Sequence, residues 1–138
     1  MIRWLKRLTR KDAAQKLLRG ARSVRREKTY SAEIGHVYQY FYEGYRDSLR
    51  DNGQGQDHVF SVTADQSNRY PVTVFFPQNV VKGWETALDR KLTPTEQYAV
   101  VKMRLFQAFD EQENLSSQAA VIIVSAADLE EHALTLDL

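Results

Sequence analysis

The sequence predicts an α+β domain that follows a strongly basic helical arm. Three observations lead to this prediction. Apolar residues recur with helical spacing in some segments and alternate in others, turn-forming residues separate these segments, and positive charge gathers at the N-terminus. The chain has 138 residues, a normal length for one domain, and 43% of them are hydrophobic. A core can therefore form without disulfides, and the chain has no cysteine.

Charge divides the chain into two unequal parts. Residues 1–28 hold eleven Lys and Arg against two acidic residues, a net charge of +9, whereas the remaining 110 residues hold eight basic and sixteen acidic residues, a net charge of −8. A charge asymmetry of this size is typical of an arm that binds an anionic partner. We therefore expect residues 1–28 to form a basic amphipathic helical arm and residues 29–138 to form a single α+β domain.

Two short helices are expected in the arm. On a helical wheel, one face of the first helix carries Ile2, Trp4, Leu5 and Leu8. The opposite face carries Arg3, Lys6, Arg7 and Arg10. The segment Thr9 to Asp12 has the form of an N-cap and predicts the start of a second helix. Opposite the apolar face of that second helix runs a basic stripe made of Lys16, Arg19, Arg22 and Arg26.

Residues 31–51 fit either a strand or a helix. Their tyrosines favour a strand, but the apolar residues fall within an arc of about 140° on a helical wheel, which favours a helix. A polar loop over residues 51–57 would follow. In such a helix Tyr40 points away from the apolar face and is therefore a candidate interface aromatic. Trp4, on the apolar face of the first arm helix, is a second candidate.

The rest of the domain is expected to contain strands and helices joined by short turns. A hairpin is predicted from strands 58–63 and 70–76, followed by a helix over 79–91. The segment Thr93 to Glu96 predicts the start of a helix over 94–113. Residues 119–125 predict an interior strand. At the end, Ser125 to Asp128 could cap a short helix, whereas Leu134, Leu136 and Leu138 alternate as in a strand. The second interpretation gives about four strands in two hairpin-like pairs, 58–63/70–76 and 119–125/133–137.

No catalytic residue, metal site or cofactor is predicted. Glu33 and His36 have the spacing of carboxylate-bridged metal centres, but no second such pair exists. No Gly-x-Ser-x-Gly motif marks a nucleophile, and the Gly53-Gln54-Gly55 segment lacks the other residues of a phosphate-binding loop. The longest apolar run, residues 119–124, is far shorter than the ~20 residues of a spanning helix. We therefore expect no transmembrane segment and a cytoplasmic or membrane-peripheral location.

The arm is the segment for which a function can be predicted. We expect a non-enzymatic binding or assembly module whose arm docks on an anionic macromolecule, with an acidic surface in a protein complex favoured over nucleic acid. Three alternatives stay open: association of residues 2–11 with an anionic membrane, docking of the arm on its own acidic body, and an enzyme without a local motif. The candidate partner-binding residues are Arg3, Lys6, Arg7, Arg10, Lys16, Arg19, Arg22 and Arg26.

Overall fold

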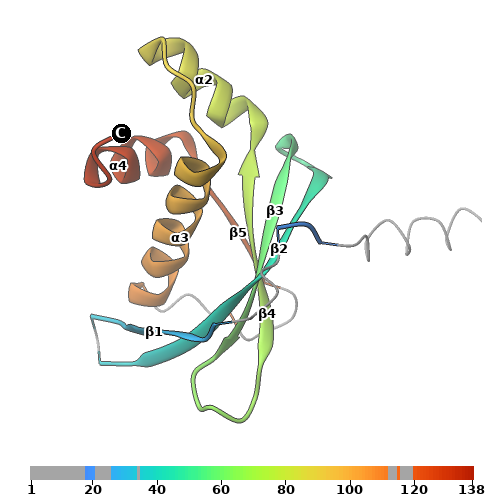
Figure 1. Cartoon of the computed structure of the whole chain (residues 1–138), viewed down its shortest axis with the longest axis vertical. Coiled ribbons are helices and arrows are strands. Elements are labelled where there is room, and N and C mark those ends of the chain that lie inside the picture. The colour runs from blue at the N-terminus through green and yellow to red at the C-terminus, as the bar shows by residue number, and fades with distance from the viewer. Residues whose placement is uncertain (1–17, 21–25, 34, 112–114, 116–119) are drawn as a thin grey trace, which may run out of the picture.

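The computed structural model describes residues 18–20, 26–33, 35–111, 115 and 120–138. These residues form five strands and three helices around one sheet of order β1-β2-β3-β4-β5 (Figure 1). The elements are β1 (Lys28–Ser31), β2 (Val37–Arg50), β3 (Gly53–Thr63), β4 (Tyr70–Pro77), α2 (Gln78–Leu88), α3 (Pro94–Asp110), β5 (Ala120–Ile123) and α4 (Ala126–Thr135). The predicted α+β class is confirmed, with five strands where about four were expected.

The core lies between the sheet and the helices. Neighbouring strands are antiparallel from β1 to β4, whereas β5 is parallel to β4 and is reached through α2 and α3. Figure 1 shows α3 and α4 on one side of the sheet, with α2 extending beyond its upper end. Because side chains alternate along a strand, every second residue of β3 and β4 faces the helices. The buried residues that meet there include Phe60, Val62, Val72, Val74, Leu105 and Phe109.

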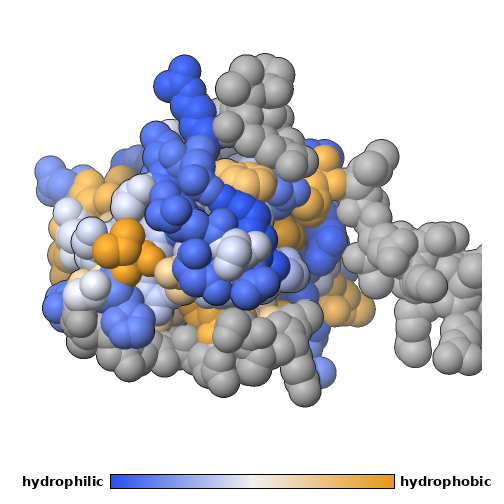
Figure 2. Space-filling model, turned by 90° about the horizontal axis from the view of Figure 1, so that it is seen from below, coloured by the Kyte–Doolittle hydropathy of each residue, from blue (hydrophilic) through white to orange (hydrophobic). Residues whose placement is uncertain are grey.

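The turn between β3 and β4 lies at the end of the sheet that is farther from α2 (Figure 1). The carboxylate of Asp65 accepts hydrogen bonds from the backbone N–H groups of Ser67 and Asn68, both at 2.9 Å. These bonds hold the pKa of Asp65 well below its usual range. Figure 2 shows the molecule from this end, where hydrophilic side chains cover most of the middle of the surface.

The prediction of a helix over residues 31–51 is wrong, because most of this segment forms the 14-residue strand β2. Tyr38, Tyr40 and Tyr42 alternate onto the face that meets α3, as a strand requires. The register then shifts between Tyr42 and Gly44, so Tyr45 returns to the same face after three positions instead of two. This mixture of two- and three-residue spacings imitates the apolar arc of a helix.

Tyr40 is therefore not an interface aromatic. It is 5% exposed and packs edge-on against Phe60 and Phe106. The expectation that it points away from the core depended on the helical wheel, which does not apply to a strand. The predicted loop over 51–57 is also wrong, because a two-residue turn at Asp51 and Asn52 leads directly into β3.

Both central helices are confirmed, with earlier C-terminal ends than predicted. The helix expected over 79–91 is α2, and the helix expected over 94–113 is α3. The hydroxyl of Thr93 accepts from the backbone N–H of Glu96, and the Glu96 carboxylate accepts from the backbone N–H of Thr93. This capping box satisfies two donors that the first turn of a helix leaves free.

The prediction of a C-terminal hairpin is wrong. The strand expected over 119–125 exists as β5, but it lies at the edge of the sheet and not in its interior. The strand expected over 133–137 is replaced by α4, which begins with a capping box between Ser125 and Asp128. Cap chemistry therefore predicts this segment better than the alternation of its leucines, of which Leu134 is 82% exposed.

The described part of the arm is not helical. The backbone N–H and C=O of Arg19 each form a 2.8 Å hydrogen bond with Tyr45, so Leu18–Gly20 runs along the free edge of β2. The predicted helical stripe is thus wrong at Arg19. The first arm helix over 2–11, together with Lys16 and Arg22, lies outside the described residues. Within the described parts of the chain, no helix is long and apolar enough to cross a membrane.

Candidate functional site

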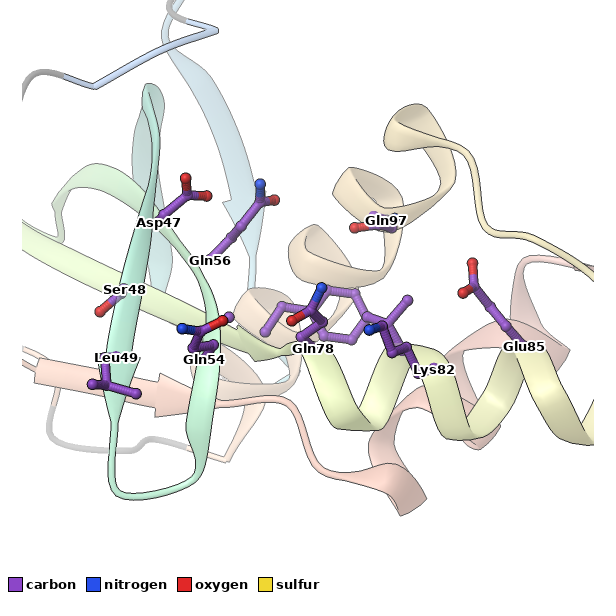
Figure 3. A pocket seen from close by; sticks show the side chains of 12 residues that line it. Asp47, Ser48, Leu49, Gln54, Gln56, Gln78, Lys82, Glu85 and Gln97 are labelled. Carbon is purple, nitrogen blue, oxygen red and sulfur yellow. The ribbon is translucent and has the colours of Figure 1, made fainter.

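A polar cleft of about 690 Å³ lies between the β2–β3 hairpin and α2 (Figure 3). The register places Asp47 opposite Gln56, with both side chains on the helix-facing side of the hairpin. On α2, Gln78, Lys82 and Glu85 follow one another at helical spacing and form the facing wall. Gln54 and Gln97 complete the polar lining, and Val81 and Phe76 lie among these polar groups.

Some of these side chains are already engaged by the protein. The carboxylate of Glu85 accepts a 2.8 Å hydrogen bond from the backbone N–H of Leu92, and the Gln97 amide donates to the Leu92 carbonyl at 3.2 Å. These two bonds fix the connection between α2 and α3. By contrast, no hydrogen bond or ion pair engages the side chains of Gln54, Gln56, Gln78 and Lys82 among the described residues.

The chemistry of the cleft favours binding by hydrogen bonds. A glutamine amide both donates and accepts, and a lysine ammonium donates three hydrogen bonds. Ser48 lies in the lining, but no histidine of the described residues lines the cleft to activate it. The arrangement fits a polar ligand such as an extended peptide main chain, and the described lining offers no activated nucleophile.

A tyrosine–histidine pair lies on the helix-facing side of β2 and β3. The hydroxyl of Tyr42 is 2.8 Å from Nδ1 of His58, whereas Nε2 of His58 is buried and has no hydrogen-bond partner within the described residues. Burial lowers the pKa of His58 to about 4, opposed in part by the charge of Asp57. Burial, with smaller contributions from Tyr98 and Tyr45, raises the pKa of Tyr42. Both groups are therefore neutral near pH 7, so the pair is poorly suited to proton transfer.

An ion cluster lies on the opposite face of the sheet. The carboxylate of Asp57 is 2% exposed and accepts two 3.0 Å hydrogen bonds from Arg50 and one of 3.3 Å from Arg46. The Arg50 guanidinium also lies over the ring of Phe75, 5.5 Å from its centroid. A buried carboxylate with two cations in hydrogen-bond contact is fully compensated, and this cluster therefore joins β2, β3 and β4.

The remaining histidines are placed differently. His36 and Glu33 are both exposed, and His132 is buried with its Nε2 2.9 Å from the amide oxygen of Gln107. In the part of the chain that the structure describes, no group of three or more histidine and acidic side chains is placed to hold a metal ion.

Arg19 connects the arm to the cleft. Its guanidinium lies 3.2 Å from the carboxylate of Asp47 at the cleft rim and 4.9 Å from the centroid of the Tyr45 ring. Arg26 is exposed. The structure does not describe the other predicted partner-binding residues, which are Arg3, Lys6, Arg7, Arg10, Lys16 and Arg22, nor the aromatic candidate Trp4.

Sequence reasoning missed the cleft because it assigned residues 54–56 to a loop and residues 47–49 to a helix. The alternation of Gln54, Gln56 and His58 was visible, yet two glycines in the same stretch favoured a turn. Comparison with models of protein families, with curated proteins and with solved structures found no match to this chain.

Proposed function

We propose that this chain is a non-enzymatic binding and assembly module whose basic N-terminal arm docks on an acidic surface of a protein partner. The observation that carries this proposal is the separation of charge, +9 over residues 1–28 against −8 over the rest. Positive charge at this density attracts anionic surfaces over a range of about 10 Å at moderate salt.

The attachment of the arm supports the proposal. Arg19 forms two backbone hydrogen bonds with β2 and an ion pair with Asp47, so Leu18–Gly20 of the arm lies beside the polar cleft. Gln54, Gln56 and Gln78 lie in that cleft without a hydrogen-bond partner among the described residues. A partner held by the arm would therefore find free hydrogen-bonding groups next to it.

Nucleic-acid binding is a second candidate, and the density of cations in residues 1–28 favours it. The expected contribution of the helical stripe is reduced, because Arg19 is already paired with Asp47. Each phosphate contact that remains should contribute about −0.9 to the slope of log affinity against log salt for duplex DNA.

The test compares two variants with the same change in charge. Arg7→Glu alters the arm, and Lys91→Glu alters an exposed cation of the body, 3.9 Å from Glu85. Poly-glutamate, duplex DNA and vesicles containing phosphatidylglycerol serve as probes at two salt concentrations. We expect poly-glutamate to bind, and Arg7→Glu to weaken that binding at least threefold more than Lys91→Glu.

Other results reject the proposal or replace it. A steep salt slope on DNA together with weak binding to poly-glutamate would favour the second candidate. Binding to vesicles alone would indicate membrane association through residues 2–11. If none of the probes binds, the arm does not dock on anionic surfaces and the proposal is wrong.

A further inference from the structure

An apolar groove of about 800 Å³ is lined by residues of α2 and α4. It is open because small residues line it: a Cβ added to Gly83 would meet no atom within 4 Å, and Ala87 and Ala133 also form its walls. Leu88 and Leu134 stand at its margins, 55% and 82% exposed. Apolar residues exposed together along a groove are typical of an interaction site. The larger lining side chains are Val80, Trp84, Leu88, Leu129, Leu134 and Leu138.

The groove has an acidic margin. After Arg104 the chain contains seven acidic residues and no lysine or arginine. Of these, Glu130 lines the groove and Glu131 and Asp137 are exposed on or just after α4. No ion pair engages these three carboxylates among the described residues, whereas Asp128 lies 3.4 Å from Arg104. Just after α2, the guanidinium of Arg90 lies over the ring of Trp84, but Arg90 is already paired with Glu96 at 2.6 Å. An apolar groove with this margin fits a helix that is apolar on one face and basic on the other.

Residues 2–11 have that pattern. Their apolar side chains, Ile2, Trp4, Leu5 and Leu8, share one helical face, and the other face carries only basic residues. Ten residues in a helix extend about 15 Å, and the ten-residue helix α4 offers a groove wall of the same length. Residues 2–11 therefore match the groove in apolar pattern, in charge and in length.

The attachment of the arm favours a neighbouring molecule over its own body. Leu18–Gly20 is bound to the free edge of β2, and Figure 1 shows this segment and α4 on opposite sides of the molecule. Only residues 9–17 connect Leu8 to that attachment point, and the ten steps from Leu8 to Leu18 reach at most about 36 Å even when fully extended. A chain of that length would have to pass around the body to enter its own groove.

We propose that the groove between α2 and α4 binds residues 2–11 of a second copy of this chain. This inference rests on the proposed function, and it names the acidic protein surface on which the arm docks. If two copies exchange arms, each contact occurs twice about a two-fold axis, which gives a closed dimer.

Sedimentation of the full chain over a concentration series measures the Kd of the dimer. The wild type is compared with one variant in the groove and one matched control. Leu134→Glu adds a charge at the groove margin, and Val37→Glu adds the same charge at a 48% exposed residue of β2. We expect the wild type to dimerise. Leu134→Glu should raise the dimer Kd at least tenfold, and Val37→Glu should change it less than twofold.

A charge exchange tests the pairing directly. Glu130→Arg with Glu131→Arg should weaken the dimer, and so should Arg3→Glu with Arg7→Glu. Because both surfaces belong to one chain, the fourfold variant should dimerise again. Failure of this rescue would overturn the assigned contact, even if each pair of substitutions weakens the dimer.

The remaining outcomes separate this inference from the proposed function. A chain that stays monomeric, or a dimer that Leu134→Glu leaves intact, overturns the inference. So does a monomer in which Leu134→Glu exposes Trp4 to iodide quenching, because the arm would then occupy its own groove. If such a monomer still binds poly-glutamate through Arg7, the proposed function stands without the inference. If the chain neither dimerises nor binds poly-glutamate, both fail.

Discussion

The hydroxyl of Tyr42 and Nδ1 of His58 lie 2.8 Å apart on adjacent strands of the sheet, on the side that faces the helices. Burial of this pair makes the stability of the protein depend on pH. The pKa of His58 is lowered from 6.5 to about 4 in the folded protein, so protons bind the unfolded chain more readily. The stability is fully present above about pH 6.5 and is lost as pH falls toward 4.

We predict that the free energy of unfolding falls by about 2 kcal/mol between pH 7.5 and pH 5 because of this histidine alone. Urea unfolding at the two pH values measures the difference. In His58→Phe most of the pH dependence in this range should disappear, whereas His36→Gln, at an exposed position, should retain it. The carboxylates with lowered pKa, Asp65 and Glu96, lose their contribution only at more acidic pH. An unchanged pH dependence in His58→Phe would show that another group is responsible.

The buried ion cluster should matter far more than an exposed ion pair on the same hairpin. Asp57→Ala leaves Arg46 and Arg50 without their shared carboxylate, and we expect a loss of about 3–5 kcal/mol. Asp47→Ala removes an ion pair with Arg19 in which both side chains are more than half exposed, and should cost less than about 1 kcal/mol. Urea unfolding of both variants gives the comparison. Equal losses would contradict the assignment of Asp57 to a desolvated cluster.

The two capping boxes and the helical stripe of α2 could be predicted from the sequence because their causes are local. A side chain at Thr93 or Ser125 satisfies backbone donors three residues away, whatever the rest of the fold does. After Ser125 the sequence carries two signals that predict different structures, the cap for a helix and the alternation of three leucines for a strand. In the structure both hydrogen bonds of the Ser125 capping box are formed and the segment is the helix α4.

The course of β2 and the polar cleft could not be predicted in the same way because they depend on distant residues. The bulge at Gly44 changes the period of the strand, and only the pairing with Val59 and His58 reveals it. The cleft joins Gln56 of β3 to Gln78 of α2 across a connection that no local pattern describes. The basic arm was predicted from its charge and from the helical spacing of its apolar residues, whereas its attachment through Arg19 depends on a β-bridge that has no sequence signature.

The contribution of aromatic residues to the core should follow their burial. Phe109 is fully buried and stacks on Tyr38, with ring centroids 4.2 Å apart, so Phe109→Ala should cost about 3–5 kcal/mol. Trp84→Ala should fall in the same range. Phe106 is only partly buried, although it stacks on Tyr30, and Phe106→Ala should cost less. Thermal unfolding of the three variants tests the order, and a larger loss at Phe106 than at Phe109 would contradict it.

A chain that begins at Thr29 should fold. It keeps three of the four residue pairs between β1 and β2 and all of the later elements, and it loses the two hydrogen bonds between Arg19 and Tyr45. Trp84 is then the only tryptophan, so its fluorescence reports on the body alone. We expect cooperative urea unfolding with a modest loss of stability. If this chain is unfolded while the full chain unfolds cooperatively, residues 1–28 belong to the core and the predicted boundary is wrong.

Gly44 should be the position on β2 that tolerates an added methyl group least. Its φ of +128° is one that side chains rarely adopt, and a Cβ there would lie 2.5 Å from the carbonyl oxygen of Arg19 and 2.9 Å from Cβ of Leu18. We expect Gly44→Ala to cost about 2–4 kcal/mol from backbone strain and from displacement of Leu18–Gly20. Gly83→Ala, in the middle of α2 with no atom within 4 Å, should instead stabilise the protein by about 0.5–1 kcal/mol.

The two causes at Gly44 can be separated because only one of them involves the arm. In the chain that begins at Thr29, neither Leu18 nor Arg19 is present, so Gly44→Ala should retain the cost of backbone strain and lose the cost of the collision. We therefore expect a smaller loss of stability there than in the full chain. In the full-length variant, hydrogen exchange at the Arg19 and Tyr45 amides should accelerate, since their mutual hydrogen bonds hold the segment to β2. An equal loss in both chains, with unchanged exchange at Arg19, would show that Gly44 is required by the bulge alone and does not secure the arm.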